Sequence, residues 1–412
     1  MEVGHGEALL LIFLIFLFCA WCYRFMYATL YRRDHLAGVL LGTAIGDALG
    51  EGYAGLHRRS ILRCYHRRLL QYRYVPARGV YGEPTRQMLL AAQALLNSCN
   101  EWKLFRLSLA RRLSWYPFSV PVGLSSRMLR CCFRSPWTRW GLEPGIADPG
   151  DVEPSTRAVF LGIALHGAGH RLASWQRNTT PLTHRNPVTI DACVFLCSLA
   201  NAAAIGRYDT TGGDGLQKKH TGPRRRPPLS PLSDPAGLMQ AQLAQCTQRE
   251  LVEPLERAAE YLHAGYSTRR AAALLGWDEG IPRHIVPVTV MSSYAFLRHS
   301  SDFQRAVHRA IGLGGATQWL GAVTGGLAGG FVGGDALPQR LIERLAGAPH
   351  DRRWMLAMAE RFSHWPHGAD DLSFAPAQPS DPLLQVARNV FELLPAGGHF
   401  IKRLIANKVW GK

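Results

Sequence analysis

Apolar residues recur every three to four positions through most of this chain, which is the spacing of an amphipathic or buried α-helix. Runs that alternate between apolar and polar residues and end in hairpin turns are scarce, so the pattern gives little support for strands. Helices are predicted over residues 85–98, 155–168, 188–205, 238–263, 267–275, 287–297, 302–311 and 337–346. We therefore expect an all-α fold.

The segment over residues 310–334 is uncharged and carries glycines one helical turn apart, at positions 321, 325, 329 and 333. Small residues at this spacing allow close helix packing inside a membrane. The high glycine content instead favours a buried central helix of a folded domain, which is the interpretation we adopt.

The amino terminus has a different pattern. Residues 8–23 form an unbroken apolar run, and its continuation to Tyr31 is long enough to cross a bilayer. Acidic residues precede it where a signal peptide has basic ones, and three arginines follow it. The positive-inside rule then predicts a single membrane anchor within residues 1–33, with the domain in the cytoplasm. If translation begins instead at Met26, the protein is expected to be cytoplasmic without an anchor.

The chain has 412 residues, 47% of them hydrophobic, which is enough for a substantial core. Its nine cysteines, an odd number, form no disulfide framework, so reduced thiols are expected. The net charge is +17, partly from a Pro-rich basic stretch within residues 207–236 that we predict to be a disordered linker. Residues 115–140 interleave aromatic residues with arginine, but packing explains them more simply than a nucleic-acid surface, and no nucleic-acid partner is expected.

Residues 36–56 read LAGVLLGTAIGDALGEGYAGL, with glycines at positions 42, 46 and 50 on one helical face. This segment resembles the opening helix and loop of the ADP-ribosylglycohydrolase family. In that family a glutamate that contacts substrate stands where this chain has Ala54.

Two further segments carry the same resemblance. Residues 182–187, LTHRNP, and residues 280–288, GIPRHIVPV, are similar to family segments, and the motifs follow in family order from about residue 36 to about residue 362. The resemblance implies a compact helical ADP-ribosylglycohydrolase-like domain over residues 34–365. A C-terminal extension over residues 366–412 lies beyond it.

The family's two metal-binding motifs are degenerate in this chain. Its Thr/Ser-Asp-Asp-Thr motif corresponds to residues 82–85, and its Gly-Gly-Asp-Thr-Asp-Thr motif corresponds to residues 314–319. The side chains that still offer oxygen are those of Glu83, Thr85, Thr317 and Gln318. A pair of Mg²⁺ ions needs several carboxylates, because oxygen ligands must offset the repulsion between the two cations. The resemblance thus leaves Glu83 and Thr85 as catalytic remnants and implies that no metal cofactor is bound.

The resemblance also assigns substrate-binding positions. His184, Gly314, Gly315 and Arg157 match positions of the family's ligand site, although Arg157 is equally compatible with a structural role under its helix. The family's glycine-rich pyrophosphate loop corresponds here to residues 151–153, Asp-Val-Glu. Two carboxylates facing a pyrophosphate would repel it, so weak binding of ADP-ribose is expected.

Two functions remain open. The first is a catalytically degenerate pseudoenzyme that acts at the membrane as a binding module for a protein partner or an ADP-ribosylated protein. The alternative is an active hydrolase that removes ADP-ribose from modified proteins, with Mg²⁺ held by the four remaining oxygen donors and water. A variant of this alternative uses His184 or His284 as a general base without metal.

Overall fold

The computed structural model describes residues 32–65, 71–75, 77–98, 100–119, 123–140, 145–147, 150–165, 169–214, 231–347, 349–363, 365 and 382–410. These residues fold into helices joined by loops, and isolated β-bridges are the only β-structure among them. The predicted all-α class is therefore confirmed. The predicted N-terminal anchor lies almost wholly outside the described residues.

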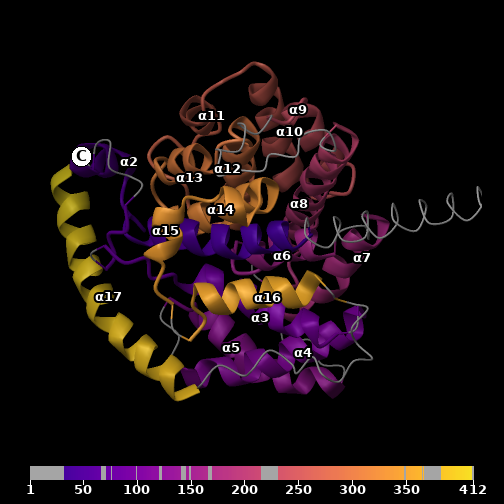
Figure 1. The fold of residues 1–412 in the computed structure, drawn as a ribbon. Helices are drawn as coiled ribbons and strands as arrows, with labels where there is room; N and C mark the ends of the chain where they lie inside the picture. The colour runs from indigo at the N-terminus through magenta and orange to yellow at the C-terminus, as the bar shows by residue number, and fades with distance from the viewer. Residues whose placement is uncertain are drawn as a thin grey trace, which may run out of the picture.

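The order of elements is as follows (Figure 1). A helix over residues 32–51, here called the first helix, precedes α2 (Arg58–Tyr65), α3 (Glu83–Leu96), α4 (Trp102–Trp115), η1 (Tyr116–Ser119), α5 (Ser126–Arg134), η2 (Ser135–Trp140), α6 (Ser155–Ala164), α7 (Gly169–Thr179), η3 (Thr180–Leu182), α8 (Pro187–Asp214), α9 (Pro235–Leu243), α10 (Arg249–His263), α11 (Thr268–Leu274), α12 (Ile285–Arg298), α13 (Phe303–Ile311), α14 (Thr317–Val332), η5 (Gly334–Ala336), α15 (Gln339–Glu343), α16 (Arg352–Ser363) and α17 (Pro382–Trp410).

The first helix and α14 lie side by side at the centre of the domain (Figure 1). A Cβ atom added to Gly46 would lie 1.9 Å from the carbonyl oxygen of Gly321, and one added to Gly42 would lie 2.3 Å from that of Gly325. The two backbones are therefore in direct contact, which only glycine allows. Nearly all residues of α14 are buried, so the expectation of a buried central helix is confirmed.

A second long apolar helix also belongs to the core. Residues 187–205 of α8 are long and apolar enough to cross a membrane, yet 83% of that stretch is buried inside the domain. Within the described residues, α8 continues to Asp214, into the range that was expected to be linker. The described thiols of Cys131, Cys132, Cys193, Cys197 and Cys246 are free, in agreement with the expectation of reduced cysteines.

The helix predicted over residues 238–263 is instead two helices, α9 and α10, separated by a turn. The backbone N–H groups of Thr247 and Gln248 donate to a carboxylate oxygen of Asp191 on α8, at 2.6 and 2.9 Å. Asp191 therefore satisfies donors at the start of α10 from a distant helix. This long-range contact, rather than the local pattern, stabilises the break.

Candidate functional site

Asp47 is the central polar residue where the first helix meets α3 and α14. Its Oδ2 accepts hydrogen bonds from the N–H groups of Gly82 and Thr85, each at 3.0 Å, and from the hydroxyl of Thr85 at 2.6 Å. Its Oδ1 accepts one from the amide of Gln318 at 3.0 Å. The carboxylate thus caps the N-terminus of α3 from another helix, where the helix dipole favours negative charge.

Asp47 was not predicted as a site residue, although the sequence carries a signal for it. It is the only charged residue between Leu36 and Gly50, and it is completely buried. A charged side chain in such a segment needs partners, because an unpaired buried charge is costly. Burial raises the pKa of Asp47 to about 6, while the hydrogen bonds from Thr85, Gly82 and Gln318 oppose that rise.

Glu83, at the start of α3, is also buried and has two donors of its own. The amide of Gln87 donates to its Oε1 and the hydroxyl of Tyr116 donates to its Oε2, both at 2.6 Å. Burial raises the pKa of Glu83 to about 7, and the nearby Arg86 acts in the opposite direction. All four carboxylate oxygens of Asp47 and Glu83 therefore accept hydrogen bonds from protein groups.

The loop before α14 is held by backbone contacts. Gly315 accepts a hydrogen bond from the N–H of Gly55 and donates one to the carbonyl of Leu56, both at 2.8 Å. Gly315 has a φ of 73°, and a Cβ atom there would lie 2.1 Å from the carbonyl oxygen of Ile281. Gly314 also has a positive φ, 82°. Both predicted ligand-binding glycines thus have a conformational reason to be glycine, and the Ala54 loop lies beside them.

The first turn of α14 is occupied by structural contacts. The hydroxyl of Thr317 donates to the carbonyl oxygen of Gly50 at 2.8 Å. The indole of Trp319 is only 2% exposed, and the guanidinium carbon of Arg283 lies 5.5 Å from its ring centroid. Of the predicted oxygen donors, Thr85 and Gln318 share Asp47 as a partner, whereas Thr317 bonds to the first helix.

A second buried cluster contains Asp151, Glu153 and His184. One ligand atom from each lies within 4.8 Å of the others, which is compatible with a metal ion by donor type. However, Arg283 pairs with Glu153 at 3.1 Å, and Arg127 lies 3.5 Å from Asp151. Burial favours a higher pKa for Glu153, but His184 and Arg283 outweigh it and hold the pKa at about 2. The negative charge expected of this loop is thus largely balanced by arginines.

Arg157 and His184 meet at Thr183. The guanidinium of Arg157 donates to the Thr183 hydroxyl, which also lies 3.0 Å from Nδ1 of His184. Burial lowers the pKa of Arg157. The Thr156 hydroxyl donates to the carbonyl of Pro84 at 2.8 Å, which ties α6 to the start of α3. Arg157 is a buried residue of α6, which favours its structural interpretation. The Thr156 contact shows that the two clusters adjoin each other.

α17 crosses this region from outside (Figure 1). The guanidinium of Arg388 donates to the carbonyl oxygen of Tyr81 at 2.7 Å and lies 4.7 Å from the centroid of that ring. Further along α17, Nε2 of His399 lies 3.1 Å from the carbonyl oxygen of Ala54. The helix therefore contacts both the residue just before Gly82 and the loop that carries Ala54.

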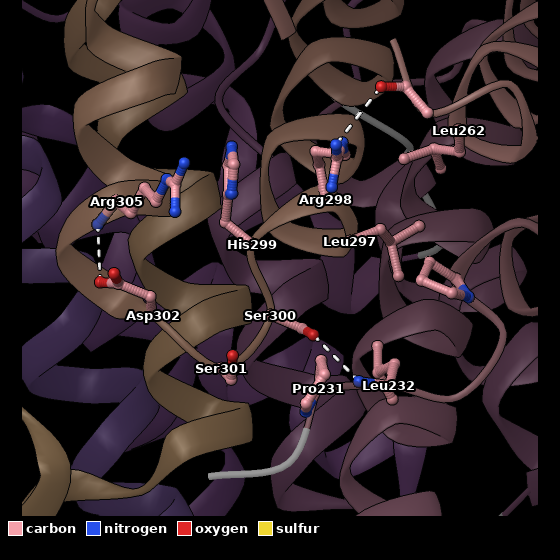
Figure 2. A pocket seen from close by; sticks show the side chains of 12 residues that line it. Pro231, Leu232, Leu262, Leu297, Arg298, His299, Ser300, Ser301, Asp302 and Arg305 are labelled. Carbon is pink, nitrogen blue, oxygen red and sulfur yellow. Dashed lines mark hydrogen bonds between the residues drawn. The ribbon is translucent and has the colours of Figure 1, made fainter. Parts of the chain in front are cut away.

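A cavity of about 430 Å³ lies elsewhere, between the α12–α13 loop and the start of α9 (Figure 2). The N–H of Leu232 donates to the Ser300 hydroxyl at 3.2 Å, and Arg298 donates to the carbonyl of Gly265 at 3.3 Å. Burial and neighbouring arginines lower the pKa of His299 to about 4. None of the site residues predicted from the sequence lines this cavity.

The raised pKa of Glu83 predicts a pH-dependent stability. A carboxyl whose pKa is higher in the folded state binds more protons there, so its contribution to stability is lost as pH rises from about 4.5 to about 7. We expect the free energy of unfolding to fall by about 3 kcal/mol over this window on account of Glu83. Asp47 acts in the same direction, but only up to about pH 6.

The check is urea unfolding of the full chain and of the Glu83→Gln variant between pH 5 and 8. Glutamine keeps an acceptor for Tyr116 but does not titrate, so the free energy of unfolding of the unchanged chain, relative to that of the variant, should fall by about 3 kcal/mol as pH rises to about 7. A difference between the two chains that stays constant or grows over this interval would contradict the assignment.

Comparisons with known families and solved structures identify the family of this chain. A model of the ADP-ribosylglycohydrolase family matches residues 28–370. Among solved structures, 46 chains match. One is described as an ADP-ribosylglycohydrolase-related protein complex; it is 22% identical, with a TM-score of 0.53, over 81% of this chain and 98% of that one. No curated protein matches. The match of the family over most of the chain, on an all-α fold similar to that structure, shows that this chain belongs to the ADP-ribosylglycohydrolase family.

Proposed function

We propose that this chain is a pseudoenzyme of its family, which has lost glycohydrolase activity and serves at a membrane as a binding module for a protein partner or an ADP-ribosylated protein. The observation that carries the proposal is that protein donors already occupy every carboxylate oxygen of Asp47 and Glu83. A carboxylate that accepts hydrogen bonds in this way has fewer lone pairs for a cation.

The residues present do not fit a pair of Mg²⁺ ions. Magnesium requires about six oxygen ligands near 2.1 Å. The N–H groups of Gly82, Thr85 and Gln318 point at Asp47, and a cation there would face donors rather than lone pairs. A Cβ atom on Gly82 would lie 2.2 Å from the Gln318 amide nitrogen, so that amide fills the adjacent space. We therefore derive no catalytic step through a metal.

The position of α17 gives independent support. This helix lies beyond the residues that match the family, and its His399 contacts the carbonyl of Ala54, at the position of the family's substrate-contacting glutamate. A helix held against that loop competes with any ligand that would approach the loop from the same side.

We expect Mg²⁺ and ADP-ribose to leave the protein's thermal stability almost unchanged. Ligand binding to the folded state stabilises it by RT ln(1 + [L]/Kd), so a ligand at about its Kd or below shifts the melting temperature by about 1 °C or less. The measurement is thermal unfolding of the full chain in millimolar MgCl₂ with and without ADP-ribose, against NaCl at equal ionic strength. A saturable rise of several degrees that disappears in Glu83→Gln would overturn the proposal.

One observation favours active hydrolysis as the second candidate. The pKa of Glu83, at about 7, lies in the range suited to a general acid or base. Release of ADP-ribose from an ADP-ribosylated protein, abolished by Glu83→Gln, would establish it. The same assay without MgCl₂ would tell whether a metal takes part.

The membrane role has its own test. If residues 1–33 hold the anchor, their deletion should release the domain from membranes after a high-salt wash, because the two long apolar helices described, α8 and α14, are buried in its core. Fractionation of cells that express the full chain and the deletion variant provides the measurement. Retention of the deletion variant after the wash would contradict the assignment of the anchor.

A further inference from the structure

One end of the domain exposes large apolar side chains on α4, η1, α5 and η2, here called the aromatic face. Its members are Leu107, Trp115, Phe118, Leu129, Phe133 and Trp137, with exposed fractions from 37% to 69%. Packing was expected to account for the aromatic residues of this segment. The exposure of Trp115, 69%, and of Phe118, 64%, shows that it does not.

The rings of Trp115, Phe118 and Phe133 form a continuous row at the centre of this face. The ring centroids of Trp115 and Phe118 are 5.8 Å apart, and those of Phe118 and Phe133 are 6.3 Å apart. Leu129 lies one helical turn before Phe133 on α5, and Leu107 shares a face of α4 with Trp115. An exposed apolar patch of this kind usually marks an interaction site.

The charged side chains of the same region are all basic. Residues 102–140 include eight basic residues and no aspartate or glutamate. Lys103, Arg111, Arg130 and Arg134 are exposed there. A partner that covers this end of the domain should therefore carry negative charge.

The start of α17 extends the face. The amide of Asn389 donates to the carbonyl oxygen of Ser119, the last residue of η1. The next two residues, Val390 and Phe391, are 50% and 63% exposed. The apolar surface thus includes a segment that lies outside the family's matched region.

We propose that the aromatic face docks onto the surface of an anionic lipid bilayer. Aromatic and leucine side chains partition into the interface between headgroups and acyl chains, while lysine and arginine contact the lipid phosphates. Leu107 and Leu129 favour lipid over nucleic acid, because single-stranded nucleic acid is bound by aromatic rings that stack on bases, and aliphatic side chains cannot stack. The inference extends the proposed membrane role to a defined surface, and it holds whether or not hydrolysis is lost.

The test is hydrogen–deuterium exchange of the full chain with vesicles of phosphatidylcholine alone or mixed with phosphatidylserine. We expect anionic vesicles to slow exchange in peptides from residues 102–137 by about fivefold, because docking stabilises α4 and α5 against local opening. The effect should be lost in Phe118→Ser/Phe133→Ser and in Arg130→Glu/Arg134→Glu. Because these side chains are exposed, both variants should stay folded, which their far-UV circular dichroism checks.

Matched controls lie at the opposite end of the domain (Figure 1). Leu274→Ser on α11 removes an exposed leucine, and Arg269→Glu/Arg309→Glu reverses two exposed arginines. These variants should behave as the unchanged chain. Equal exchange with and without anionic vesicles, equal losses in the controls, or greater slowing by poly(U) RNA than by vesicles would each overturn the inference. No metal or ADP-ribose is present, so a failed pseudoenzyme proposal would leave this result unaffected.

Discussion

Replacing Gly325 with alanine is expected to prevent stable folding of the domain. The added Cβ would lie 2.2 Å from the carbonyl oxygen of Gly42 on the first helix. The backbone of α14 fixes the position of the Cβ atom, and the oxygen belongs to the backbone of the first helix, so no side-chain rotation can relieve the contact, and the helices must separate. Overpacking a core typically costs about 1–3 kcal/mol. A clash between two central helices should exceed that range and remove much of a total stability of about 5–15 kcal/mol.

The measurement is the soluble yield and the urea midpoint of the full chain with this substitution. The matched control is Gly397→Ala on α17, where an added Cβ meets no atom within 4 Å. That change should be neutral or stabilising by up to about 1 kcal/mol, because alanine favours helix more than glycine does. If both variants unfolded at the same urea concentration as the unchanged chain, the close approach of the two helices would be wrong.

The contact between the first helix and α14 could be predicted from the sequence, because glycines four residues apart lie on one face of a helix. The spacing of Gly42 and Gly46 placed both glycines on one helical face, and in the structure the matching glycines of α14 pack against that face. The local glycine spacing was sufficient to predict this contact, since both helices carry it.

Other features depend on contacts that local sequence does not contain. α4 was not predicted, because leucines and Trp115 on its exposed side mask the amphipathic pattern. α5 was also not predicted, although its sequence does carry an amphipathic pattern. The break between α9 and α10 depends on Asp191, and the start of α3 depends on Asp47. In both cases a buried carboxylate caps a helix that is distant in sequence, so no local capping residue marks the boundary.

The candidate site was likewise only partly predictable from the sequence. Alignment to the family motifs correctly brought Thr85 and Gln318 together, because the fold fixes the two helix N-termini that carry them. The motifs did not reveal that Asp47 would accept hydrogen bonds from both. They also did not reveal that Arg283 would balance the charge of Glu153, because that pairing joins residues far apart in sequence.

Restoring the family's acidic residues should create a site that binds Mg²⁺. The substitutions are Pro84→Asp, Ala316→Asp, Gln318→Asp and Trp319→Thr. They add carboxylates at the N-termini of α3 and α14, where helix dipoles favour negative charge. Ala316 is the N-cap residue of α14, a position that aspartate also favours for capping.

Without metal the repaired chain should be less stable. Removing the buried Trp319 indole leaves a cavity that costs about 3–5 kcal/mol, and the clustered carboxylates repel one another. Saturating Mg²⁺ should return about 2.7 kcal/mol when its concentration is about 100 times its Kd. Calorimetric titration and thermal unfolding in MgCl₂ measure both effects. Trp319→Thr alone is the control, since it makes the same cavity without adding a ligand set.

Hydrolysis of ADP-ribosylated protein should remain slow even in the metal-loaded variant. Asp151 and Glu153, paired with Arg127 and Arg283, still replace the family's glycine-rich loop, and Ala54 still replaces the family's glutamate. Brisk release of ADP-ribose after the four substitutions alone would show that this loop does not exclude the ligand. A folded variant that binds no Mg²⁺ would show instead that the starts of α3 and α14 are not spaced to share a metal, because the three added carboxylates would then stand beside those of Asp47 and Glu83 without a common centre.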